Sequence, residues 1–180
     1  MSEDHGENPF GAVEGESALL IALPELDPEL GPWLAETSSD GIGAHITVLV
    51  PFLPAPELTE EVLAALHGAF GAFAAFDLVF AKTARFPEVL YLVPEPAGPI
   101  RDMIAAVYAR RPQYPPYGGA FEEPTPHASV LHAKTEAEYD EARRALEPRL
   151  PLRTRAAAVE LVVFDGSRWN VRERFPLAGG

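Results

Sequence analysis

Two short segments of the sequence carry the same arrangement of side chains that could do acid–base chemistry. The first is HITVL at residues 45–49, and the second is HASVL at residues 127–131. Both segments are short, apolar or β-branched and follow Gly or Pro, which predicts strands over residues 44–52 and 126–132. Residues i and i+2 of a strand point to the same face. Each strand therefore presents an imidazole beside a hydroxyl, and two such pairs could enclose one phosphate.

The chemistry that suits these residues is acid–base catalysis of the attack of water on a phosphate ester. The reaction needs a base that takes the proton of water and an acid that protonates the leaving oxygen. Histidine can do either because its ordinary pKa is about 6.5. One imidazole must start neutral and the other protonated, on opposite sides of phosphorus, and His45 and His127 on separate strands allow this. Thr47 and Ser129 would donate hydrogen bonds to the non-bridging oxygens, where negative charge builds up.

This pair of H-x-[TS] motifs resembles the 2H phosphoesterase superfamily and, within it, the 2′-5′ RNA ligase-like (RNA 2′,3′-cyclic phosphodiesterase) proteins. The resemblance extends over about residues 17–175. It implies an α+β fold that is bilobal and pseudo-duplicated, with two antiparallel-rich sheets, outer helices and a central cleft. It also implies His45, Thr47, His127 and Ser129 as catalytic residues that open 2′,3′-cyclic phosphates of RNA ends or nucleotides to 2′-phosphates. Some members of this family join tRNA halves through a reversible 2′-5′ linkage.

Length and composition predict a single domain. The chain has 180 residues, no cysteine and an acidic, polar N-terminus, and no apolar run long enough to span a bilayer. We expect a flexible acidic tail over residues 1–16 and one domain of two lobes over residues 17–176. We also expect a cytoplasmic monomer without a cofactor. No metal is expected, because the carboxylates near the motifs lack metal-ligand spacing. The absence of cysteine excludes a disulfide framework and a thiolate zinc site.

The charge of the chain restricts its partners. A net charge of −13 disfavours broad contact with nucleic acid, which requires many Lys and Arg contacts to phosphates. We therefore expect an RNA terminus or a small nucleotide with a cyclic phosphate as partner, without an extended nucleic-acid footprint and without a membrane. Two alternatives stay open: a non-catalytic module that binds a nucleotide phosphate, and a phosphodiesterase for another small cyclic phosphate, such as an ADP-ribose cyclic phosphate.

The spacing of apolar residues, and the Gly and Pro residues that interrupt regular structure, predict the remaining elements. Helices are predicted near residues 29–36, 59–73, 99–110 and 135–146, with Thr59 as a cap and Thr135 and Glu138 as a capping box. Further strands are predicted over residues 17–23, 76–86, 88–94, 152–164 and 169–175. Residues 111–126 form the longest irregular segment, and such segments are often functional.

Several residues outside the two motifs are candidates for substrate contact. They are four aromatic residues and one arginine: Phe52, Tyr91, Tyr117, Phe121 and Arg85. A surface ion pair is an equally good interpretation of Arg85. For each aromatic residue, a position in the core or at the rim is more common than stacking on a base. The alternation of the second motif strand places His132 on the face opposite His127, so His132 is predicted to be structural, and Val48 and Val50 are predicted to point into the core.

Overall fold

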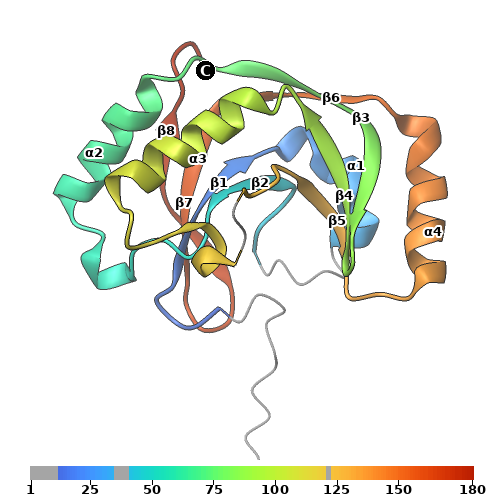
Figure 1. Ribbon diagram of the computed structural model, residues 1–180, viewed down its shortest axis with the longest axis horizontal. Coiled ribbons are helices and arrows are strands. Elements are labelled where there is room, and N and C mark those ends of the chain that lie inside the picture. Colours follow the sequence, from blue (N-terminus) through green and yellow to red (C-terminus); the bar gives the residue numbers. More distant parts are fainter. Residues whose placement is uncertain (1–11, 35–40, 121–122) are drawn as a thin grey trace, which may run out of the picture.

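A computed structural model describes residues 12–34, 41–120 and 123–180 of the chain. Its strands form one eight-stranded sheet in the order β6-β3-β4-β5-β2-β1-β7-β8, and each neighbouring pair is antiparallel. The sheet is strongly curled (Figure 1). In chain order the strands are β1 (Ser17–Ala22), β2 (His45–Leu49), β3 (Phe76–Phe86), β4 (Val89–Glu95), β5 (Ala128–His132), β6 (Leu152–Ala156), β7 (Ala158–Phe164) and β8 (Trp169–Pro176).

Among the described residues, four α-helices flank the sheet (Figure 1). They are α1 (Asp27–Leu34), α2 (Glu60–Gly71), α3 (Gly98–Arg110) and α4 (Glu136–Leu146). Helix α2 packs on β8 and contacts α3, which packs on β2, whereas α1 packs on β5. Four short 3-10 helices, η1 (Pro24–Leu26), η2 (Ala55–Glu57), η3 (Pro116–Gly119) and η4 (Glu147–Arg149), occupy the connections.

The predicted α+β class is confirmed, but the prediction of two sheets is wrong. The strands form one sheet because β2 and β5 pair with each other in its middle, with Ile46 opposite Ala128. A sequence pattern indicates where strands lie, and it does not show which strand edges meet. The internal duplication of the chain stays a prediction.

The prediction of one long strand over residues 152–164 is also wrong. Residues 152–156 form β6 and pair with β3 at one edge of the sheet, whereas residues 158–164 form β7 between β1 and β8. The chain therefore changes from one side of the sheet to the other around Ala157. Apolar alternation continues through this position, so the break left no signal in the hydrophobic pattern.

One face of the sheet and the helices that cover it form the main core. Buried side chains of the two motif strands, such as Ile46 and Val130, pack with apolar residues of α2 and α3, among them Leu66, Phe70 and Met103. A smaller cluster, made of Ala18, Leu20, Val162, Phe164 and Trp169, lies apart from it. The main core thus fixes one face of β2 and β5 and leaves the opposite face for the site.

The predicted helix caps are confirmed. The Thr59 hydroxyl accepts a hydrogen bond from the backbone N–H of Val62 at 3.3 Å. At α4, Thr135 and Glu138 form a capping box, in which each side chain accepts from the other residue's backbone N–H. Such caps satisfy N–H groups that have no partner inside a helix, and they stop the first turn from fraying.

The predicted tail over residues 1–16 lies mostly outside the described residues. At its end, the backbone N–H of Gly15 donates to the Phe164 carbonyl at 2.8 Å, and the Phe164 N–H donates to the Glu16 carbonyl at 2.9 Å. Residues 15 and 16 are thus attached to the end of β7. In the described stretches, no helix is both long enough and apolar enough to cross a membrane.

Candidate active site

The two motif strands lie side by side at the centre of the sheet. With Ile46 opposite Ala128, antiparallel pairing places His45 beside Ser129 and Thr47 beside His127. Ile46 and Ala128 are fully buried in the core, so the four polar side chains share the opposite face. The structure therefore brings the four predicted catalytic residues together.

Both histidine rings are held by the same kind of hydrogen bond. Nδ1 of His45 lies 2.8 Å from the carbonyl oxygen of Gly43, and Nδ1 of His127 lies 2.7 Å from the carbonyl oxygen of Thr125. A carbonyl oxygen only accepts hydrogen bonds, so Nδ1 must carry the proton and donate in each case. Each neutral ring is therefore the tautomer with a free lone pair on Nε2, which is the atom left for proton transfer.

The backbone that holds His45 is itself fixed by α1. Asp27 accepts a hydrogen bond from the backbone N–H of Ala44 at 2.7 Å. A Cβ atom at Gly43 would lie only 2.5 Å from the Asp27 carboxylate, so glycine is the residue that allows this close approach. The Asp27 charge also favours the protonated form of His45, although this effect is smaller than that of burial.

Burial controls the protonation of both histidines. Loss of contact with water lowers the pKa of His45 and of His127 below the ordinary value of 6.5. For each ring the hydrogen bond to the backbone carbonyl acts in the opposite direction and raises the pKa. A charge on His127 further lowers the pKa of His45. The two rings are thus close enough for the protonation of one to disfavour the protonation of the other.

Each motif strand contains a β-bulge directly after its Thr or Ser. In β2, Leu20 of β1 pairs with Thr47 and Leu19 pairs with Leu49, which leaves Val48 as an extra residue. In β5, the equivalent extra residue is Val130, between Ser129 and Leu131. The two residues of each bulge, Val and then Leu, are both buried. The Val-Leu pair that the two motifs share is therefore the bulge, and it reverses the alternation of the strand.

The bulges correct two sequence predictions. His132 was predicted to lie on the face opposite His127, and Val50 was predicted to point into the core, but both are half-buried and line the same cavity as the catalytic candidates. An extra residue in a strand moves every later side chain to the other face. Burial, with smaller contributions from His127 and His45, lowers the pKa of His132 to about 4, so this third imidazole is neutral at neutral pH.

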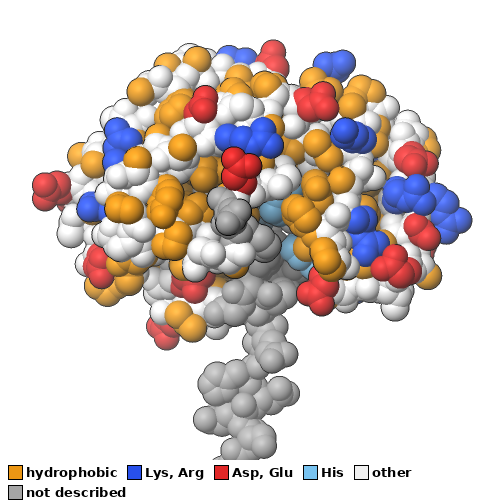
Figure 2. All heavy atoms as spheres, in the orientation of Figure 1, with side chains coloured by type: hydrophobic (Ala, Val, Ile, Leu, Met, Phe, Trp, Pro, Cys, Tyr) orange, Lys and Arg blue, Asp and Glu red, His pale blue; other side chains and the backbone are white. Residues whose placement is uncertain are grey.

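The cavity has a volume of about 70 Å³. Its walls are mainly apolar, and its polar side chains carry three imidazoles, two hydroxyls, one phenol and the indole N–H of Trp169. Figure 2 shows histidine side chains in a hollow of the molecular surface. The lining residues that the structure describes are Ala18, Leu20, Leu34, Ile42, His45, Thr47, Val50, Tyr117, His127, Ser129, His132 and Trp169, and no Lys or Arg is among them.

The predicted substrate-binding residues occupy different places. Tyr117 lines the cavity and hydrogen-bonds to the side chain of Thr47. Tyr91 is buried and stacks on Phe86 with 4.4 Å between ring centroids. The His127 ring packs against both rings in T-shaped geometry, with centroids 5.2 Å from Phe86 and 5.4 Å from Tyr91. Tyr91 therefore packs against the His127 ring and does not line the cavity. Phe52 is buried in the core beside α2 and α3, away from the cavity, and Phe121 lies outside the described residues.

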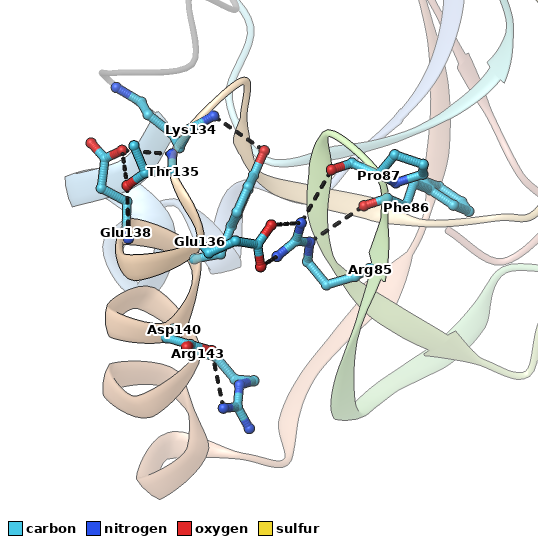
Figure 3. Close-up of polar contacts among 10 residues, drawn as sticks. Arg85, Phe86, Pro87, Lys134, Thr135, Glu136, Glu138, Asp140 and Arg143 are labelled. Carbon is cyan, nitrogen blue, oxygen red and sulfur yellow. Dashed lines mark hydrogen bonds and ion pairs between the residues drawn. The ribbon is translucent and has the colours of Figure 1, made fainter.

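The structure does not bring Arg85 to the cavity. Its guanidinium forms two hydrogen bonds with the Glu136 carboxylate, at 3.1 and 3.3 Å, and donates to the carbonyl oxygens of Phe86 and Pro87 (Figure 3). It also lies over the Tyr139 ring, 3.7 Å from the centroid. These contacts join the end of β3 to the first turn of α4.

Sequence reasoning missed several lining residues. His132 and Val50 were misplaced by the bulges, and Trp169 comes from β8 at the edge of the sheet, three strands from β2. The signal that could have shown the bulges is the repeated Val-Leu after each motif, where two adjacent apolar residues interrupt strict alternation. Within the described residues, no group of three or more His, Asp or Glu side chains could hold a metal ion. A metal-free site stays a prediction.

Comparison with known families places the site in context. The model of the 2′-5′ RNA ligase superfamily matches residues 34–168, a segment that contains both motifs. No curated protein shows significant sequence similarity to the chain.

Several solved structures share the fold. Escherichia coli LigT in apo form superposes with a TM-score of 0.61 at 17% identity, covering 93% of this chain and 99% of that one. TT0787 of Thermus thermophilus gives a TM-score of 0.60 at 20% identity, covering 89% and 97%. LigT complexed with 3′-AMP gives 0.57 at 17% identity, covering 92% and 99%.

Proposed function

Because the chain belongs to the 2′-5′ RNA ligase superfamily, we propose that it is a metal-independent phosphodiesterase that opens 2′,3′-cyclic phosphates of RNA ends or nucleotides. Membership of this superfamily supports a phosphoesterase-type function. The observation that carries the finer proposal is the matched pair of rings: His45 and His127 line one cavity, and each has Nδ1 occupied by a backbone carbonyl.

The proposed reaction needs only side chains of this chain and water. One imidazole takes a proton from water through Nε2 as the water oxygen bonds to phosphorus. The bond between phosphorus and the ribose 3′-oxygen breaks, and the second imidazole, protonated at the start, gives its proton to that oxygen. The products are a 2′-phosphate and a free 3′-hydroxyl. The two rings have exchanged protonation states, and proton exchange with solvent restores them.

The hydroxyls would stabilise the charge that develops on phosphorus. Thr47 lies beside His127 and Ser129 beside His45, so one donor accompanies each ring. Donors that are already in place when charge develops need no reorganisation during the reaction. Thr47 is also β-branched and therefore has few side-chain rotamers, which holds its hydroxyl in position.

The charge of the cavity favours a singly charged phosphodiester as substrate. Among the described lining residues the cations can come only from histidine, and burial makes their protonation difficult. A cyclic phosphodiester carries one negative charge, which a single protonated imidazole can balance. LigT, which shares the fold, binds 3′-AMP in one of its structures, and a nucleotide ligand is consistent with this proposal. We do not propose RNA ligation, because a net charge of −13 disfavours contact with a whole tRNA.

The test is a panel of cyclic phosphates, each assayed with and without EDTA. It contains nucleoside 2′,3′-cyclic phosphates, an ADP-ribose cyclic phosphate and a linear 3′-5′ dinucleotide. We expect turnover of the nucleoside 2′,3′-cyclic phosphates to the 2′-phosphate, unchanged by EDTA. Loss of activity in EDTA that a divalent metal restores would refute the metal-free mechanism. Tight binding without turnover of any member would instead identify a binding module.

A further inference from the structure

Tyr117 reaches the cavity from the long irregular segment before the second motif, and its backbone is unusual. It lies in η3 with φ 52° and ψ 34°, in the left-handed region that residues other than glycine rarely occupy. Its backbone N–H donates to the Val50 carbonyl oxygen at 2.7 Å, which ties η3 to the end of β2. A left-handed conformation is unfavourable for an L-residue, so the surrounding contacts must hold Tyr117 in this position.

The side chain of Tyr117 contacts one of the four catalytic candidates. It lines the cavity and forms a side-chain hydrogen bond with Thr47. Burial raises the pKa of Tyr117 above its ordinary value, so the group is a protonated phenol at neutral pH. Tyr117 is the only tyrosine among the described residues that line the cavity. Ser129, the other hydroxyl, therefore has no equivalent phenol there.

We propose that Tyr117 is a positioning residue that directs the Thr47 hydroxyl toward the substrate phosphate; this rests on the function proposed above. A threonine hydroxyl has one hydrogen to donate and two lone pairs to accept with. An ionised phosphoryl oxygen can only accept, so Thr47 must donate to it. When Thr47 donates its one hydrogen to the phosphate, Oγ1 of Thr47 can only accept from Tyr117. The phenol O–H of Tyr117 is then the donor in the hydrogen bond between the two side chains. Hydrogen bonds in such a chain polarise one another, which makes Thr47 a better donor.

This role differs from stacking of a nucleobase on the Tyr117 ring. Stacking would use the aromatic face, would strengthen substrate binding and would not need the phenolic oxygen. Positioning of Thr47 needs the oxygen and acts when charge develops on phosphorus. Tyr117→Phe separates the two, because it keeps the ring and removes the donor.

The experiment is a double-mutant cycle on a nucleoside 2′,3′-cyclic phosphate, with Ser129 as matched control. We expect Tyr117→Phe to lower kcat by roughly 3- to 10-fold, the range for loss of one hydrogen bond, with little change in KM. In a Thr47→Val background the same change should have almost no effect, because its target is gone. In a Thr47→Ser background, which keeps the hydroxyl, the loss should reappear. In a Ser129→Ala background it should also remain in full, because the two hydroxyls act separately.

Two results would overturn the inference. One is an undiminished kcat for Tyr117→Phe, and the other is an equal loss with and without the Thr47 hydroxyl. A raised KM at unchanged kcat would assign Tyr117 to substrate binding. His45→Ala and His127→Ala are assayed in parallel, and full activity of both would refute the paired-histidine mechanism on which the role of Thr47 depends.

A binding measurement gives a readout without turnover. The same cycle is measured on the Kd of 2′-AMP. Tyr117→Phe should leave this Kd nearly unchanged, because Tyr117 acts when charge develops on phosphorus, and a Kd weakened equally with and without the Thr47 hydroxyl would assign Tyr117 to substrate binding. Melting temperatures of all variants are compared, and the wild-type value is expected for Tyr117→Phe. If the wild type neither turns over cyclic phosphates nor binds 2′-AMP, the inference and the proposed function are both wrong.

Discussion

At the scale of single residues, two histidines share one cavity, and burial makes both harder to protonate than a histidine in water. The profile of kcat/KM against pH reports the free enzyme, in which the pKa values of His45 and His127 are lowered. Activity requires one ring neutral and one charged, so we expect a bell-shaped profile with its maximum below about pH 6.5. The bound anion favours protonated imidazole, so the profile of kcat should lie at higher pH. Coincident profiles with a maximum well above that pH would contradict this prediction.

His132 should link the stability of the fold to pH. Its pKa is about 4 in the folded protein, against 6.5 for an ordinary histidine. The unfolded chain therefore binds the proton more readily, and the stability that depends on neutral His132 is complete above about pH 6.5 and decreases as the pH falls toward 4. After allowance for solvent screening, we expect a loss of about 2 kcal/mol. Denaturant unfolding over this pH range should show a smaller loss for His132→Gln than for the wild type, and equal losses would count against a buried neutral ring.

At the scale of elements, α1 supports the catalytic strand through one hydrogen bond. Asp27→Ala removes the acceptor for the Ala44 N–H and frees the residues that hold His45, so we expect kcat to fall roughly 10-fold. Asp27→Asn keeps an acceptor oxygen but removes the charge that favours protonated His45, so kcat should be largely retained. Its pH profile should shift on the limb that belongs to His45, toward lower pH. The matched control is Asp77→Ala, which breaks an exposed ion pair with Arg155, and an equal loss of kcat in this control would remove the special role of Asp27.

The elements also show how far a sequence alone leads. The histidines and hydroxyls were predictable because strand alternation fixes which side chains share a face, and the caps of α2 and α4 were predictable because they depend on local residues. His132 and Val50 were not, because a bulge depends on how the neighbouring strand pairs. The strand break at Ala157 was missed for a related reason: both halves are apolar, and their partners lie at different positions in the sheet. The positions of His132 and Val50 and the strand break at Ala157 all depend on contacts between segments that are distant in the sequence.

At the scale of the whole molecule, the acidic charge should restrict recognition to the end of an RNA. We expect kcat/KM for an RNA that ends in a 2′,3′-cyclic phosphate to be close to that of the mononucleotide, because net charge −13 offers little attraction to further phosphates. The slope of log(kcat/KM) against log salt should correspond to about one neutralised phosphate. A steep slope, or internal cleavage of linear RNA, would show a nucleic-acid footprint that this charge argues against.

The most direct test of the paired-histidine mechanism is the turnover of 2′,3′-cyclic AMP by His45→Ala, His127→Ala and the double variant, with melting temperatures measured alongside. Each single variant should lose roughly 10²–10⁴ in kcat, the usual contribution of a positioned acid or base. The double variant should lose much less than the product of the two, because the rings act as a unit. All three should melt close to the wild type, since the rings line a cavity and do not fill the core. Normal folding with near-wild-type turnover, or early unfolding that accounts for the lost activity, would contradict the mechanism.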